Sequence, residues 1–149
     1  MRLVVQRVSR AAVTVGDLVV GRIGRGLVVF AGMATGDGPA DLEYAASKIR
    51  DMRVFPDADG RMNHSVVETG GSVLLVSQFT LLADLRKGRR PAFDEAADPG
   101  HARPLYEALL ARLRELGLLV EAGQFQAHMH VDLTNDGPVT ILLDSRRTF

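Results

Sequence analysis

Four consecutive residues, Ser77-Gln78-Phe79-Thr80, are the first candidates for chemistry in this chain. They place two hydroxyls and an amide at the end of an apolar run, and we predict a strand over residues 72–81. Polar side chains at the end of a buried strand often line the rim of a pocket. The alternative is purely structural, because Ser and Thr at a strand end also hydrogen-bond to nearby backbone groups.

A second candidate is the segment Asn135-Asp136-Gly137-Pro138-Val139-Thr140, which separates predicted strands at 129–133 and 139–143. Gly137 can adopt the positive φ that tight turns need, and Pro138 fixes φ and removes a backbone donor. A peptide bond before proline can be cis at a cost of only about 0.5–1 kcal/mol. The pair could therefore form a rigid element with outward-pointing carbonyls, and an ordinary hairpin turn is the alternative.

Two other groups of residues have weaker signals. His128 and His130 are two apart on a predicted strand and so share a face, but no third metal ligand is evident, which favours exposed histidines. A basic loop at 84–93 contains four cations that could bind phosphates, namely Arg86, Lys87, Arg89 and Arg90. Such a run more often forms a solvated loop.

Length and composition restrict the class of protein. A chain of 149 residues with 46% hydrophobic and 24% charged residues fits one globular domain, 1–149. With no cysteine, it can form neither disulfides nor thiolate metal sites. The net charge of zero argues against a broad phosphate-coating surface, so any nucleic-acid contact should be local. No apolar run reaches the roughly 18 residues of a membrane helix, and we expect a cytoplasmic protein.

The elements that must position these candidates follow from hydrophobic patterning. Further strands are predicted at 3–8, 11–15, 18–23, 27–32 and 53–55, and the run at 27–32 is apolar enough to be buried on both faces. A first helix should open at Gly36-Asp37-Gly38-Pro39, with the proline in its first turn, and end near Met52. A second should span 102–116, with Leu105, Leu109, Leu113 and Leu116 facing inward.

Taken together, Ser77-Gln78-Phe79-Thr80-Leu81, Lys87-Gly88-Arg89-Arg90-Pro91 and the segment at 135–140 resemble the bacterial D-aminoacyl-tRNA deacylase family. The similarity runs from end to end, since other short motifs match in order and spacing: Gln6-Arg7-Val8, Gly26-Leu27, Asp59-Gly60-Arg61-Met62-Asn63, Leu105-Tyr106-Glu107, and Gly123-x-Phe125 before Met129. Three residues depart from the family pattern, which has glycine at Gln126, serine at Ala92 and lysine at Arg61. These departures concern pocket detail and RNA contacts rather than the reaction.

The resemblance implies an α+β fold, a single-domain layered β/β/α sandwich with an antiparallel-rich sheet and two main helices. It also implies a homodimer with two pockets at the interface, each built from residues 77–80 of one subunit and Gly137-Pro138 of the other. That peptide would be cis, Arg7 would hold it through hydrogen bonds, and Met129 would pack beneath it. No cofactor, metal, membrane or DNA partner is implied.

The implied reaction is hydrolysis of the ester between a D-amino acid and the terminal adenosine of tRNA, with L-amino acids rejected by Gly137-Pro138. Glycyl esters, including glycine mischarged on tRNA(Ala), would pass because glycine has no side chain to reject. We favour direct attack by water, with N–H groups of Phe79 and Thr80 stabilising the oxyanion; Thr80 as covalent nucleophile is the alternative. The basic loop would bind the acceptor end. Two other functions remain open: a non-catalytic nucleic-acid-binding module and a Thr80-dependent hydrolase of small esters or amides.

Overall fold

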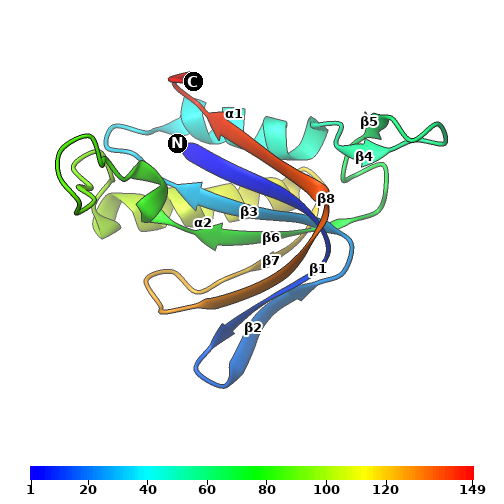
Figure 1. Cartoon of the computed structure of the whole chain (residues 1–149), viewed down its shortest axis with the longest axis horizontal. Helices are drawn as coiled ribbons and strands as arrows, with labels where there is room; N and C mark the ends of the chain where they lie inside the picture. The colour runs from blue at the N-terminus through cyan, green and yellow to red at the C-terminus, as the bar shows by residue number, and fades with distance from the viewer.

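The computed structural model describes residues 1–149 and contains two α-helices, a short 3-10 helix and eight strands (Figure 1). In chain order the elements are β1 (Arg2–Val15), β2 (Leu18–Ile23), β3 (Gly26–Gly32), α1 (Pro39–Asp51), β4 (Phe55–Pro56), β5 (Met62–His64), β6 (Ser72–Ser77), η1 (Phe79–Leu82), α2 (Pro99–Glu115), β7 (Leu119–Ala122) and β8 (His130–Asp144). All strands except β4 and β5 belong to one six-stranded mixed sheet.

The long strand β1 organises this sheet. β8 pairs antiparallel with β1 along almost its whole length, while β3 and β2 pair with its first and second halves. β6 then pairs parallel with β3, and β7 parallel with β6. The two parallel strands β3 and β6 consist almost entirely of buried aliphatic residues, as expected for strands covered on both faces.

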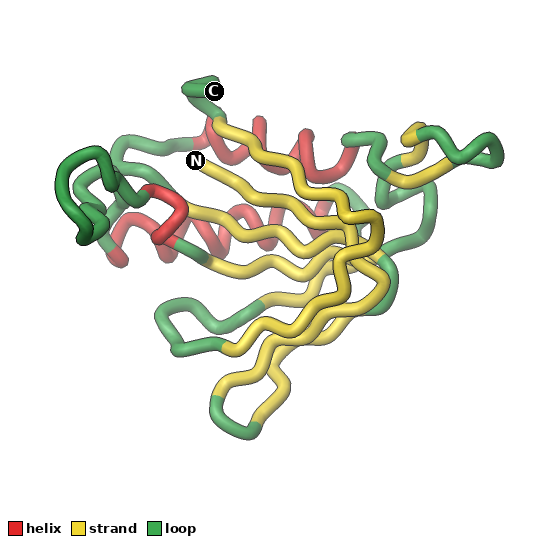
Figure 2. Tube along the Cα trace, in the orientation of Figure 1, coloured by secondary structure: helices red, strands yellow, loops and turns green.

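The sheet bends over itself, which gives the molecule its layers (Figure 2). β2 crosses β7 so closely that a Cβ on Gly21 would lie 2.9 Å from the carbonyl oxygen of Ala122. A small core that includes Val13, Ile23 and Leu74 fills the space between the two β layers. A larger core separates the sheet from α1 and α2, which both cover its other face. The predicted α+β class with a layered β/β/α arrangement is therefore confirmed.

The helices largely follow their predicted positions. Asp98 accepts a hydrogen bond from the backbone N–H of His101, so α2 begins at Pro99, three residues before the predicted start at 102. Its buried face contains Ala102, Tyr106, Leu109 and Leu113, whereas the predicted Leu105 and Leu116 are only partly buried. Neither α1 nor α2 has the length and apolar character that a membrane-crossing helix needs.

Several predicted strand boundaries are wrong. The pairs of strands predicted at 3–8 and 11–15, and at 129–133 and 139–143, are single strands, β1 and β8, that pair with each other through shared irregularities of register. The hairpin alternative fails because the chain on both sides of Gly137-Pro138 runs in one direction along β1, with Asn135 opposite Val8 and Thr140 opposite Gln6. The strand predicted at 53–55 is reduced to β4, since its only partner is the three-residue β5.

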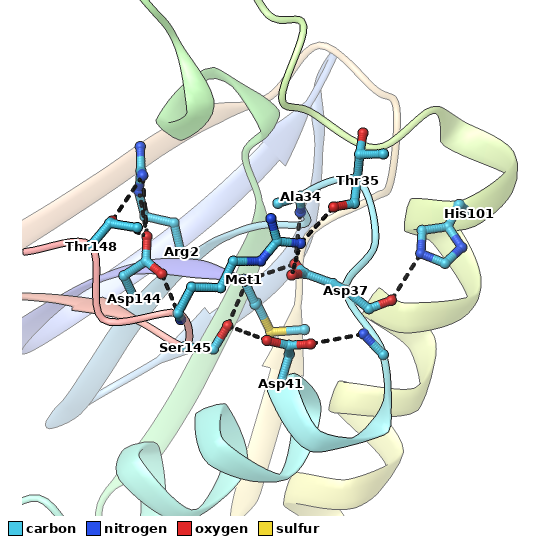
Figure 3. Close-up of polar contacts among 12 residues, drawn as sticks. Met1, Arg2, Ala34, Thr35, Asp37, Asp41, His101, Asp144, Ser145 and Thr148 are labelled. Carbon is cyan, nitrogen blue, oxygen red and sulfur yellow. Dashed lines mark hydrogen bonds and ion pairs between the residues drawn. The ribbon is translucent and has the colours of Figure 1, made fainter.

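A buried polar network joins the beginning of β1 to the chain that follows β8 (Figure 3). The ammonium group of Met1 lies 2.6 Å from a carboxylate oxygen of Asp37, and both side chains are fully buried. Asp37 also accepts from the backbone N–H of Ala34 and from Arg146, while Ser145 accepts from the Met1 ammonium. These contacts hold the β3–α1 loop and the C-terminal segment together.

Candidate active site

A pocket of about 460 Å³ opens at the C-terminal ends of β3 and β6. Its walls come from four parts of the chain: Ala31 and Met33, residues 77–80, the beginning of α2, and residues 125–129 of the β7–β8 loop. In Figure 1 the arrowheads of β3 and β6 point toward this side of the molecule, where η1 and the β7–β8 loop lie. The volume lies in the usual range for small-ligand sites, and the lining is mainly apolar with a few polar groups.

The predicted residues Ser77, Gln78, Phe79 and Thr80 all line this pocket. The predicted strand at 72–81 ends early, because β3 ends at Gly32 and the last ladder-like hydrogen bond runs from the N–H of Gln78 to the oxygen of Ala31. The chain then turns into η1. As first residues of a helical turn, Phe79 and Thr80 have backbone N–H groups that donate to no acceptor in the protein.

The side chain of Thr80 has one polar partner. Gln78 donates from Nε2 to Thr80 Oγ1 over 3.1 Å, and no imidazole or carboxylate contacts the hydroxyl. A nucleophilic threonine needs a base to accept its proton. The arrangement therefore contains uncommitted backbone donors and no activated nucleophile.

Two aromatic rings line the pocket, Phe79 and Phe125, and each packs against another ring outside it. Phe79 is 57% exposed and meets the ring of Phe93 edge-on, with centroids 4.9 Å apart. On the other side, Phe125 packs against Tyr106, whose hydroxyl donates to the oxygen of Leu75 over 2.9 Å. Burial raises the pKa of Tyr106 to about 12, so this phenol stays neutral at physiological pH.

Met129 lines the same pocket from the β7–β8 loop. It lies against Gly123, where a Cβ would come within 2.7 Å of the Met129 sulfur. The absence of a side chain at Gly123 is therefore what allows Met129 to reach the pocket.

Gly137-Pro138 lies on a different part of the molecule. The peptide between the two residues is cis, and a Cβ on Gly137 would lie 2.8 Å from the backbone nitrogen of Val139. The guanidinium of Arg7 holds this segment, donating from Nε to the oxygen of Asp136 over 2.8 Å and from Nη1 to the oxygen of Val54 over 2.6 Å. The Arg7 side chain is only 11% exposed, its bond to Val54 is partly buried, and its bond to Asp136 lies at the surface.

The sequence analysis missed one residue that fixes this segment, Asn135. Its Oδ1 accepts from the N–H of Val139 over 2.8 Å, and its Nδ2 donates to the Val139 oxygen over 3.1 Å. The side-chain amide thus bridges the two sides of Gly137-Pro138 as a backbone partner would. The only signal was its position before Asp-Gly, where asparagine reads as a turn residue.

Strand register measures how far this element is from the pocket of its own chain. Gly137-Pro138 lies level with Arg7, which is opposite Leu27 on β3, whereas Ser77 is opposite Ala31. Four residues along the strands and three strand spacings across the sheet place the two about 20 Å apart. The pocket accordingly contains neither Gly137 nor Pro138. The predicted site residues form two groups, at opposite ends of the sheet.

The basic loop does not present four equivalent cations. Arg86 forms a two-pronged ion pair with Asp84 and thereby lowers the pKa of that carboxyl to about 2. Lys87, Arg89 and Arg90 are exposed and make no ion pair. The rings of His128 and His130 lie 5.2 Å apart, and no third ligand joins them.

This fold is found in solved structures. One, titled c-Myc DNA Unwinding Element Binding Protein, matches with a TM-score of 0.91 and 41% identity, covering 97% of this chain and 98% of that one. Another, titled as a structural analysis of a probable eukaryotic D-amino acid tRNA deacylase, has a TM-score of 0.79 over 95% of this chain and 97% of its own. At 19% identity it supports the fold alone.

The sequence comparisons are more specific. The profile described as D-Tyr-tRNA(Tyr) deacylase matches residues 4–144. Proteins named D-aminoacyl-tRNA deacylase from Symbiobacterium thermophilum and Anaeromyxobacter dehalogenans are each 59% identical over 100% of this chain, covering 99% and 100% of their own lengths. The chain belongs to the D-aminoacyl-tRNA deacylase family, as its motifs predicted. It is therefore an enzyme, a hydrolase that acts on D-aminoacyl-tRNA.

Proposed function

We propose that this chain removes D-amino acids from tRNA in a pocket that a second copy of the chain completes. The observation that carries the proposal is the separation of about 20 Å between Gly137-Pro138 and Ser77 within one subunit. An element that far away cannot contact a substrate bound by its own Phe79 and Thr80. In a homodimer, each copy would insert its Gly137-Pro138 into the pocket of the other.

A second hollow beside the pocket supports this arrangement. It has a volume of about 580 Å³, shares Ser77, Gln78 and Met129 with the pocket, and is lined mostly by apolar side chains, among them Phe30 and Val131. On β8, Leu142 is 58% exposed. Apolar surface of this kind beside a polar site is typical of a protein interface. It provides the area on which a partner subunit would pack.

The chemistry requires little from the protein, because an aminoacyl ester is already activated. Water adds to the ester carbonyl, and the free N–H groups of Phe79 and Thr80 donate to the oxyanion that forms. Such donors contribute roughly 3–4 kcal/mol in other enzymes. The C–O bond to the ribose then breaks, the ribose oxygen takes a proton, and the products are a free D-amino acid and tRNA. The neighbouring 2′-hydroxyl of the terminal adenosine helps to activate the water.

Selection between mirror-image substrates follows from the rigidity of Gly137-Pro138. Arg7 and Asn135 hold this segment, so it acts as a fixed wall in the partner's pocket. A D side chain points away from the wall, and an L side chain collides with it. A steric clash of this kind rejects a substrate more strongly than one added contact attracts it. Glycine has no side chain to collide, so glycine on tRNA(Ala) is also hydrolysed.

The RNA is bound by its acceptor end alone. Phe79, exposed and supported by Phe93, offers a stacking surface for the terminal adenine, and such stacking contributes about 1–3 kcal/mol. Lys87, Arg89 and Arg90 contact phosphates nearby, while Arg86 is partly neutralised by Asp84. We assign the reaction to the cytoplasm, where its substrate is made.

A deacylation time course with D- and L-tyrosyl-tRNA tests the proposal. We expect fast release of D-tyrosine and almost none of L-tyrosine. Subunit exchange tests the dimer: in a copy with Ala97→Trp the indole fills the pocket that Ala97 lines, and a copy with Gly137→Val lacks the wall. Mixed dimers should contain one site with both halves intact and regain selective D-hydrolysis. Equal hydrolysis of both enantiomers by the wild type, or a fully active monomer, would refute the proposal.

A second candidate is nucleic-acid binding without catalysis. It is favoured by the solved structure of 41% identity whose title names a protein that binds a DNA element. On this alternative the chain would bind tRNA or single-stranded DNA and leave D-tyrosyl-tRNA intact. Filter binding beside the deacylation assay separates the two functions.

A further inference from the structure

One wall of the pocket contains a cation that the reaction scheme above does not use. Arg103, in the first turns of α2, lies with its guanidinium carbon 4.7 Å from the centroid of the Phe125 ring. Its Nη2 donates to Oε1 of Gln126 over 3.1 Å. Phe125 and Gln126 both line the pocket. Arg103 itself does not line the pocket, but it contacts two adjacent residues that do.

The charge of Arg103 is not neutralised within the protein. It belongs to none of the ion pairs of the chain. A guanidinium has five N–H donors, of which this one uses a single donor for Gln126. No other hydrogen bond engages the remaining donors, and Arg103 is an exposed residue. Pro99 and Ala102 at the beginning of α2 also line the pocket, so the positive end of the helix dipole reinforces the potential here.

The backbone conformation of Gln126 supports a specific contact between Gln126 and Arg103. Its φ is 62°, in the left-handed region that non-glycine side chains rarely occupy. A glycine at this position would adopt this φ without strain. A glutamine here accepts that strain and in return supplies the oxygen that holds Arg103. The Gln126 side chain therefore has a defined hydrogen-bond partner, Arg103.

We propose that Arg103 binds the phosphate that joins the terminal adenosine of the substrate to the rest of the tRNA, with Phe125 and Gln126 holding the guanidinium in place. The inference rests on the proposed function, because it takes the pocket to hold the aminoacylated adenosine. A guanidinium fixed by a ring and an amide loses little freedom when it forms a forked pair with a phosphate. Arg103 would then favour esters that carry this phosphate over esters of free adenosine.

The test compares substrates that differ only in the phosphate. D-tyrosyl-adenosine without a phosphate, the same ester with a 5′-phosphate, and D-tyrosyl-tRNA are hydrolysed by wild type and Arg103→Ala. We expect the variant to lose about tenfold in kcat/KM, mainly through KM, on the two phosphate-bearing esters. On D-tyrosyl-adenosine the loss should stay below about twofold. An equal loss on all three esters, or none, would overturn the proposal.

Two further variants separate phosphate binding from damage to the wall. Gln126→Gly keeps the guanidinium over Phe125 and removes its hydrogen bond, so we expect a loss of about threefold confined to the phosphate-bearing esters. Arg25→Ala is a matched control, because Arg25 also lies over a phenylalanine ring, Phe55, at 5.3 Å and away from the pocket. It should leave all three rates unchanged. If the wild type hydrolyses none of the esters, the proposed function itself fails, which is a different result from an Arg103 variant that ignores the phosphate.

Discussion

The two groups of site residues differ in how firmly the chain holds them. Around Gly137-Pro138, Arg7 bonds two carbonyls and Asn135 bridges the element with both atoms of its amide. At the pocket, Phe79 is largely exposed and Thr80 has a single side-chain partner. The end that we propose to exclude a mirror-image substrate is therefore held by several hydrogen bonds. The end that we propose to bind the ester and the tRNA has fewer.

This difference suggests that the two groups of residues have separate roles, which mutations can test. Changes at the Gly137-Pro138 end should alter the discrimination between D and L substrates. Changes at the pocket end should alter rate or affinity and leave discrimination intact.

The largest effect is expected for Gly137→Ala. The added Cβ would lie 2.8 Å from the Val139 nitrogen and so must displace the wall. We expect the D-over-L ratio of kcat/KM to fall by about 100-fold, equivalent to about 2.7 kcal/mol. Gly16→Ala is the control: it also places a side chain at a positive φ, 57° at Gly16 against 150° at Gly137, but nothing lies within 4 Å of the added Cβ. Unchanged selectivity in Gly137→Ala would contradict the wall.

Arg7→Ala should come next. It removes two hydrogen bonds from a charged donor, each worth about 1.5–3 kcal/mol. We expect urea denaturation to give a free energy of unfolding about 3 kcal/mol lower, and selectivity to fall about tenfold. Arg7→Lys keeps the charge but reaches one carbonyl at most, so its effects should be intermediate. A stable variant with full selectivity would show that Arg7 does not hold the wall.

Thr80→Ala should have a smaller effect, confined to rate. Because the hydroxyl contacts Gln78 and no base, we expect kcat to fall by less than about tenfold with the D-over-L ratio unchanged. Loss of a true covalent nucleophile lowers kcat by a factor on the order of 10⁴ or more. Such a loss, together with an acyl-enzyme seen by mass spectrometry in the wild type, would establish the alternative mechanism.

The smallest effect is expected for Asp84→Asn, which frees Arg86 for the RNA. The lowered pKa of Asp84, about 2, means that the pair is formed at any pH above about 4 and weakens only as pH falls toward 2. Between pH 5 and 8 the wild type therefore keeps Arg86 engaged. The variant should show a slope of log affinity against log salt that is steeper by about 0.7 to 0.9. The D-over-L selectivity should not change. An unchanged salt slope would show that Arg86 does not contact the RNA even when it is released from Asp84.

The sequence predicted best those features that depend on short motifs and on the hydrophobic pattern of neighbouring residues. The family, the fold class and the apolar strand at 27–32 all followed from residue type and order. Sequence reasoning failed for Asn135, because an asparagine before Asp-Gly is also an ordinary turn residue. It failed for the continuity of β8, because that depends on pairing with β1, more than a hundred residues earlier. The early end of β6 was missed for the same reason: it depends on where β3 ends. Arg103 was missed because a single arginine on a helix carries no pattern.

The register of β8 on β1 has a practical consequence for the discovery of inhibitors. The hollow in a single chain has no contact with Gly137 or Pro138, so it lacks the two residues that we propose to reject L-amino acids. A compound selected by docking to one isolated chain would be chosen without that wall. Screening against the proposed dimer would select compounds that also fit beside Gly137-Pro138.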